Sequence, residues 1–278
     1  MNTLRTGLRA QRAGTAGAAV LAAAAVTALL APLLISPDAL DVTRVTAAAW
    51  QPPGADHWLG TDHTGRSVAV LMAQGTGTSL FVGLTAAVLS VGIGTLVGVL
   101  SGHFGGLFAG ALLRVTDFFL VLPALVLAIA LSTVLPRGLG TIILAIGLTS
   151  WPSTARMVRA QTLTIEARPF VERARALGGG HAHVIGRHVL PSVVPLVLVN
   201  ATLAVASAIV AESTLAFLGL GDPTRISWGA LLHQAQLHGA VPQQAWWSLL
   251  PPGLAIVAVV LAFTLVGRAL EAVVTPKR

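Results

Sequence analysis

Long stretches without any charged residue dominate this sequence and favour a fold that is buried in a membrane. No charge occurs from Ala13 to Pro37 or from Ser67 to Leu113. Composition agrees, because 55% of the residues are hydrophobic, 10% are charged, and the mean hydropathy is +0.82. Since one membrane crossing takes ~20 residues, 278 residues can form a bundle of about six helices. We therefore expect an all-α polytopic membrane protein.

The apolar stretches predict six crossing helices and four regions of the chain. The first stretch could be a signal peptide, but it is longer than the usual ~7–15-residue apolar core of one, so we expect a retained helix. The expected helices cover residues 13–36, 79–101, 116–135 with a kink at Pro123, 139–157, 192–213 and 249–270. The expected regions are a basic cytoplasmic tail (1–12), the first transmembrane helix (13–36), an extracytoplasmic segment (37–77) and the main transmembrane domain (78–278).

The distribution of basic residues predicts the orientation of these helices. Thirteen of the 17 Lys and Arg residues fall on one side of the expected membrane, together with both termini. Basic residues near membrane helices concentrate on the cytoplasmic side, so both termini are expected there. This asymmetry explains the net charge of +7 without a nucleic-acid partner, which would need its arginines on one folded face. The four basic residues on the outside are Arg44, Arg66, Arg137 and Arg225.

Two residue counts exclude several kinds of chemistry. The chain has no cysteine, which rules out disulfides, thiolate metal sites and cysteine nucleophiles. Its single lysine, Lys277, is not part of a Gly-Lys-Ser/Thr phosphate loop, so an ATP that drives the protein binds elsewhere. No nucleophile and base, and no pair of carboxylates, are placed for catalysis. We expect neither an enzyme nor a resident cofactor.

The charged segment 166–191 separates two apolar stretches and predicts a compact knob. Pro169 suits a first helical turn, and apolar residues follow at i, i+1, i+4 and i+7 from Phe170. Glycines 178–180 end this short amphipathic helix, and a second short pattern from Val184 leads to the next apolar span. The alternative is a solvated loop with positive-inside charges.

Within this segment, Glu172, Ala174, Gly178 and the closing Leu190-Pro191 resemble the EAA loop of permeases in binding-protein-dependent ABC importers. In that family the loop is a coupling helix that docks into a groove of the ATP-hydrolysing subunit. The sequence departs from the family pattern at Arg173, where alanine is usual, and at His188, where an apolar residue is usual. The resemblance assigns this coupling role to Phe170, Glu172, Arg173, Ala174, Arg175, Leu177, Gly178, Leu190 and Pro191.

Other short segments resemble the dipeptide, oligopeptide and nickel branch of these permeases. They are His57 to Asp62 with Gly65-Arg66, His103 to Gly106, Phe217 to Gly221, and Ser227 to Gly229. By chemistry alone, the first is a turn with an interfacial tryptophan, Trp58.

The branch resemblance implies an importer of peptides, or of nickel or a metal chelate, that works by alternating access in a prokaryotic plasma membrane. It also implies a heterodimer with a homologous permease, two ATPase subunits that bind ATP and Mg, and an extracytoplasmic binding protein. A competing hypothesis is a carrier driven alone by protons or ions. Such a carrier needs ionisable residues near the middle of the bilayer, and the expected spans are almost free of charge.

A few ionisable residues invite individual predictions. Glu212 ends an apolar span, so it is either an interfacial residue or a residue lining the outer part of the translocation path. Asp117 is expected at a helix start, where a carboxylate favours the helix dipole. His181, His183 and His188 lie close together but lack a carboxylate at ligand spacing, so packing is favoured over metal binding.

Overall fold

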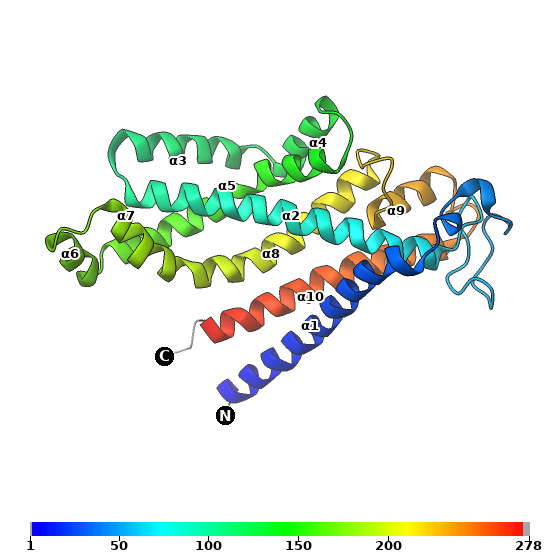
Figure 1. Ribbon diagram of the computed structural model, residues 1–278, viewed down its shortest axis with the longest axis horizontal. Coiled ribbons are helices and arrows are strands. Elements are labelled where there is room, and N and C mark those ends of the chain that lie inside the picture. The colour runs from blue at the N-terminus through cyan, green and yellow to red at the C-terminus, as the bar shows by residue number, and fades with distance from the viewer. Residues whose placement is uncertain (1, 275–278) are drawn as a thin grey trace.

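The computed structural model describes the backbone of residues 2–274 and the side chains of residues 12–273. Within that part the chain is a long helical bundle without a β-sheet (Figure 1). The helices are α1 (Asn2–Leu34), α2 (Val68–His103), α3 (Gly106–Val121), α4 (Ala124–Val134), α5 (Leu139–Glu166), α6 (Pro169–Ala176), α7 (His181–Val184), α8 (Leu190–Phe217), α9 (Trp228–Leu237) and α10 (Leu250–Val274). Short turns are η1 (Pro37–Ala39), η2 (Val42–Arg44), the π turn η3 (Ile185–Val189) and η4 (Trp246–Ser248).

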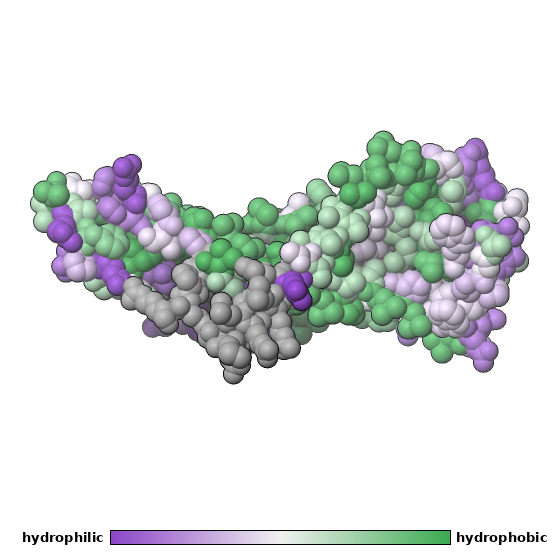
Figure 2. Space-filling model, turned by 90° about the horizontal axis from the view of Figure 1, so that it is seen from below, coloured by the Kyte–Doolittle hydropathy of each residue, from purple (hydrophilic) through white to green (hydrophobic). Residues whose placement is uncertain are grey.

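The surface has the pattern of a membrane protein. Figure 2 shows hydrophobic residues over the middle of the molecule and hydrophilic residues gathered at its two ends. Of the described helices, four spans are long and apolar enough to cross a membrane, and α3 with α4 makes a fifth if the bent pair counts as one. The other expected crossing lies in α5, whose 28 residues suffice in length. Its Ser, Thr and Arg residues make it more polar, and much of it is buried between other helices.

The two ends of the bundle are formed by different elements. Helix α6 lies at one end, and the cap formed by residues 35–67 and α9 lies at the other (Figure 1). Both described chain ends are in the half of the molecule that contains α6. The basic tail expected at residues 1–12 is continuous with α1, which begins at Asn2. Lys277 and Arg278 lie outside the described residues.

Helix α2 is the central element, and glycines let α5 pack directly against it. A Cβ at Gly98 would lie 2.7 Å from the carbonyl oxygen of Ala155 and 2.7 Å from Cβ of Val158. Gly94 and Gly102 meet α5 in the same way, one turn before and one turn after Gly98. Such small residues allow close backbone approach between membrane helices.

The expected single helix 116–135 is wrong, because Pro123 breaks it rather than kinking it. Helices α3 and α4 meet at 89°. Proline lacks the N–H that a continuing helix needs, and it forces the preceding residue into an extended conformation. Leu122 accordingly has ψ 131°, and Pro123 becomes the N-cap of α4.

The expected position of Asp117 at a helix start is also wrong. Helix α3 begins at Gly106, so Asp117 lies in its second half. Its carboxylate accepts a hydrogen bond of 2.6 Å from Nη2 of Arg156 on α5. Both side chains are more than half exposed, so the ion pair contributes little stability.

Several expected helix boundaries differ from the structure, and α5, for example, extends to Glu166 rather than residue 157. Helix α2 begins at Val68 rather than near residue 79, because its first turns pack against the cap. The short helix expected before Pro191 is continuous with the next span, and together they form one helix from His181 to Phe217. The π turn widens this helix immediately before Pro191, whose ring does not fit into a regular α-helical interior.

Candidate functional site

The predicted short amphipathic helix is present as α6, and one apolar side chain anchors it. Val171 is its only buried residue. It packs in a cluster with Val99, Val158, Ile165, Val184, Val189 and Val193, which come from α2, α5 and the start of the α7–α8 span. Gly178 ends the helix with φ +88°, a conformation that L side chains rarely adopt.

The remaining surface of α6 is open. Leu177 is 89% exposed and Phe170 is 42% exposed, which is unusual for large apolar side chains outside a membrane belt. A shallow depression of about 650 Å³ joins most of the predicted coupling residues, and Glu172 and Arg175 are exposed beside it. The depression is lined by Phe170, Arg173, Ala174, Leu177, Gly178, Gly179 and His183.

Two predicted coupling residues lie apart from this depression. Leu190 lines a groove between α2 and α8, and Pro191 is exposed in the first turn of α8. His188 packs near Phe170, with ring centroids 5.6 Å apart, as expected for a packing histidine. Among the described residues, no group of three or more His, Cys, Asp or Glu side chains is arranged to hold a metal ion.

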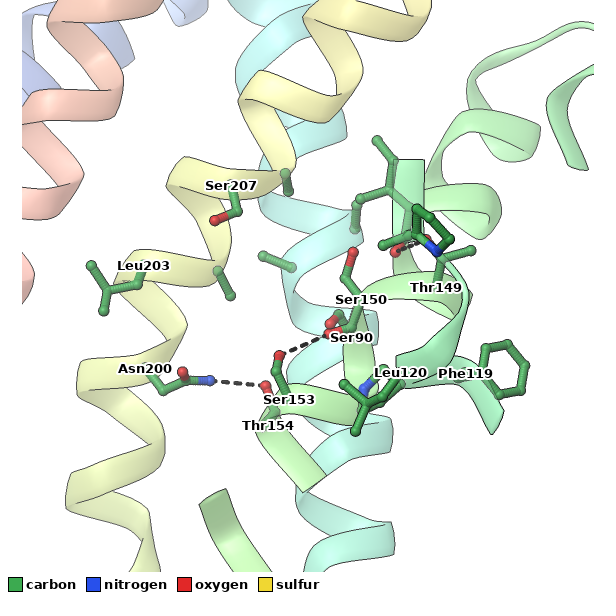
Figure 3. Close-up of a pocket in the computed structure, with 18 of the residues that line it drawn as sticks. Ser90, Phe119, Leu120, Thr149, Ser150, Ser153, Thr154, Asn200, Leu203 and Ser207 are labelled. Carbon is green, nitrogen blue, oxygen red and sulfur yellow. Dashed lines mark hydrogen bonds between the residues drawn. The ribbon is translucent and has the colours of Figure 1, made fainter. Parts of the chain in front are cut away.

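A second site is a cavity of about 460 Å³ near the break between α3 and α4 (Figure 3). Asn200 on α8 points toward α5 and donates a hydrogen bond of 2.9 Å to Oγ1 of Thr154. No charged side chain lines the cavity, so it offers only neutral hydrogen-bonding groups and apolar surface. Its polar side chains are Ser90, Thr149, Ser150, Ser153, Thr154, Asn200 and Ser207.

Polar residues in two of the apolar stretches are a sequence signal for this cavity. Residues 149–154 read TSWPST within an otherwise apolar stretch, and Asn200 and Ser207 lie two helical turns apart on α8. Polar residues at helical spacing indicate a face that lines water or a partner. The sequence alone does not show that these two faces, with Ser90 of α2, meet across one space.

Glu212 is buried at the outer end of α8. The residue is 1% exposed, so its carboxylate does not face water. Ser213 donates a hydrogen bond of 3.3 Å to Oε2. Glu212 does not line the cavity of Figure 3.

We expect Glu212→Ala to destabilise the protein by about 1–3 kcal/mol, because it removes the hydrogen-bond acceptor of the buried Ser213 hydroxyl. Glu212→Gln keeps hydrogen-bonding atoms there and should cost less. Thermal unfolding of the purified variants measures this difference, and uptake assays test the hypothesis that Glu212 lines the outer translocation path. Normal uptake by both variants would contradict that hypothesis.

The sequence of the chain matches a known protein family. Residues 94–278 match the family described as "Binding-protein-dependent transport system inner membrane component". The match includes α6 and the cavity-lining residues from Phe119 to Ala208, but not those on α2. The chain belongs to this family of ABC importer permeases.

Relatives of the permease support the same conclusion along most of its length. It is 36% identical over 273 residues to a Brucella suis protein named as a peptide transport system permease, covering 97% of this chain and 90% of that protein. It is 33% identical over 270 residues to the oligopeptide transport system permease protein OppC of Bacillus subtilis, covering 97% of this chain and 87% of that protein. The permease is therefore a multi-pass inner-membrane transport subunit, not an enzyme, and it works with an ATPase and a binding protein.

Hydrogen bonds and packing hold the cap of the permease to its membrane helices. Asp222 accepts a hydrogen bond of 3.1 Å from the backbone N–H of Leu139, which ties the loop after α8 to the start of α5. A hydrogen bond from the Thr224 hydroxyl is the main cause that lowers the pKa of Asp222. Gly60 has φ +66° and packs against Trp247, whose indole N–H donates to the carbonyl oxygen of Thr61 at 3.1 Å. The segment from His57 to Asp62 is thus a packed turn in this cap, and Trp58 is exposed.

The cap of the permease should loosen on acidification. The rings of His63 and His238 stack with centroids 3.6 Å apart. Burial, with the charges of His238 and Arg66, lowers the pKa of His63 below its ordinary value of 6.5, against the opposing effect of Asp62. The folded cap with neutral His63 is therefore at its full stability above pH 6.5, and it loses stability as the pH falls through the lowered pKa of His63.

Hydrogen exchange of residues 57–67 at about pH 7.5 and about pH 5 measures this effect, with intrinsic exchange rates corrected for pH. We expect protection to fall at the lower pH in the wild type and to change less in His63→Phe. Equal loss of protection in both proteins would show that another group is responsible.

Proposed function

We propose that the permease imports peptides by alternating access, along a path that has the cavity of Figure 3 in its wall. The observation that carries this proposal is the lining of the cavity. Serine and threonine hydroxyls and the Asn200 amide both donate and accept hydrogen bonds, which suits the N–H and C=O groups of a peptide backbone. A wall without charges favours no particular side-chain charge, so it suits peptides of varied sequence. The relatives named as peptide permeases support the same substrate class.

The shape of the site supports the proposed partner subunits. The cavity is a recess with an open side, which fits a path completed by a second, homologous permease in a heterodimer. An extracytoplasmic binding protein would deliver the peptide at the cap. Two ATPase subunits would bind ATP and Mg in the cytoplasm, where the end of the bundle with α6 and both termini would lie. The arginines of α6 and the π turn support this orientation by the positive-inside rule.

Helix α6 would be the coupling helix of this importer. Its exposed apolar residues, Phe170 and Leu177, and its shallow depression suit a protein partner better than water. Closure of the ATPase pair on ATP would displace α6. Helices α5 and α8, which flank the segment, would then change the side of the membrane to which the cavity opens. Coupling requires that ATP and the loaded binding protein favour the same outward-facing state.

Co-purification tests this function. We expect the wild type in detergent to bring a second permease and two ATPase polypeptides, whereas Glu172→Ala and Gly178→Asp lose the ATPases and keep the second permease. Gly178→Asp places a side chain where φ is +88° and adds a negative charge on the exposed surface. Arg187→Gln, on the exposed π turn, is the control and should keep the ATPases. ATPase retention by both loop variants would contradict the coupling role, and uptake of nickel without uptake of peptides would replace the proposed substrate.

A further inference from the structure

Four polar side chains at the base of α6 form a continuous chain of contacts between four helices. His103 at the end of α2 contacts Glu166 at the end of α5, with Nδ1 and Oε1 2.5 Å apart. Nε2 of the same ring lies 2.8 Å from Nδ1 of His181, the first residue of α7. The second carboxylate oxygen of Glu166 accepts a hydrogen bond from Arg175 on α6. Each member of the chain therefore comes from a different helix.

The directions of these hydrogen bonds are consistent with one another. A carboxylate only accepts, so Nδ1 of His103 carries the proton that it donates to Glu166. In a neutral His103 ring, Nε2 is then an acceptor for the Nδ1–H of His181. Both oxygens of Glu166 take part, because one accepts from His103 on α2 and the other accepts from Arg175 on α6.

Burial strengthens the His103–Glu166 contact of this chain, whereas His181 is exposed. The side chain of His103 is fully buried and that of Glu166 is 11% exposed, whereas Arg175 is 46% exposed. Phe104 covers His103 edge-on, with ring centroids 4.9 Å apart, and also lies beside His181. Charge-assisted hydrogen bonds that are shielded from water are shorter and stronger than neutral or exposed ones.

Helix α6 has few other attachments to the membrane helices. Val171 is its only buried side chain, and its N-cap residue Arg168 bonds to the end of α5 through a backbone N–H that donates to the carbonyl oxygen of Ile165 at 3.0 Å. A short helix held by one apolar residue would tilt when a partner pushes on it. The polar chain supplies a second attachment point, near the opposite end of α6.

We propose that His103, Glu166, Arg175 and His181 form a polar clamp that makes α6 move rigidly with α2 and α5. The clamp residues are positioning residues, and their role rests on the proposed coupling function of α6. The clamp would transmit displacement of α6 to α2 and α5, two of the helices that line the cavity, instead of letting local tilting absorb it.

The test combines Glu166→Gln, Arg175→Gln and the double variant, with Arg187→Gln as a control that removes an arginine from the exposed π turn. The first readout is the number of peptides imported per ATP hydrolysed by the complete transporter in vesicles. We expect Glu166→Gln, which is not one of the predicted coupling residues, to keep its ATPases. Each clamp variant should lower this ratio about three- to tenfold, and the double variant should be no worse than either single one. Arg175→Lys, which keeps the charge, should restore most of the ratio.

A second readout does not depend on the proposed function. The chain has no cysteine, so a spin label attached through Ala176→Cys at the end of α6 reports the motion of this helix alone. The label should become more mobile in all three clamp variants and stay unchanged in Arg187→Gln.

Three outcomes would overturn the clamp. The first is additive losses in the double variant. The second is ATPase loss in Arg175→Gln alone, which would make Arg175 a direct ATPase contact. The third is an unchanged label mobility in every clamp variant. If the wild type binds no ATPase, the proposed coupling function fails, and label mobility then decides whether the clamp holds α6.

Discussion

Gly98→Leu should prevent the permease from folding into a stable bundle. A side chain at this position starts within 2.7 Å of the backbone of α5, which cannot withdraw without separating α5 from α2. Inserting bulk into a packed interior typically costs about 1–3 kcal/mol, and contact with a backbone atom leaves little room for relief. Because α5 and α2 both line the cavity, their separation would also destroy the proposed path.

Size-exclusion profiles and thermal unfolding of tagged protein in detergent measure this effect. Gly92→Leu is the matched control, since it lies on the same helix and a Cβ there meets nothing within 4 Å. We expect Gly92→Leu to elute and unfold like the wild type, whereas Gly98→Leu aggregates or is missing from the membrane fraction. Equal behaviour of the two variants would contradict the packing of α2 on α5.

Asn200→Trp should stop peptide uptake while leaving the transporter assembled. The Asn200 side chain points toward α5 (Figure 3), so an indole there would occupy the space between α8 and α5 and remove the hydrogen bond to Thr154. We expect uptake to fall about tenfold or more, which corresponds to about 1.4 kcal/mol of added barrier.

The control for this variant is Val210→Trp, which adds the same bulk to α8 at an exposed position outside the cavity. Uptake by this control should be close to that of the wild type, and both variants should co-purify with their ATPases. Normal uptake by Asn200→Trp would remove the cavity from the translocation path.

Local signals in the sequence predicted α6, at one end of the bundle. The proline at 169, the apolar residues that follow it and the glycines from 178 each act within one helical turn, and they predicted α6. The sequence predicts a kink at Pro123 but not the full break between α3 and α4, because the break depends on whether these two helices find separate packing partners. The continuity of α7 with α8 was missed because a π turn has no local sequence signature.

Features that join distant residues could not be predicted from one sequence. The cavity requires the polar faces of α2, α5 and α8 to point at one another, and the helical periodicity of each face does not fix its neighbour. The polar clamp joins His103 to residues 63 and 78 positions later in the chain. Each of these residues, taken alone, was typical of a loop beside a membrane helix.

Uptake by the reconstituted transporter tests the central claim most directly. The permease is placed in vesicles with its second permease and ATPases, ATP is supplied on the side of α6, and the binding protein with a labelled oligopeptide is supplied on the side of the cap. We predict that peptide accumulates only with hydrolysable ATP and binding protein, and that Gly178→Asp abolishes accumulation. Accumulation without ATP, driven by a proton or ion gradient and unaffected by Gly178→Asp, would contradict the account.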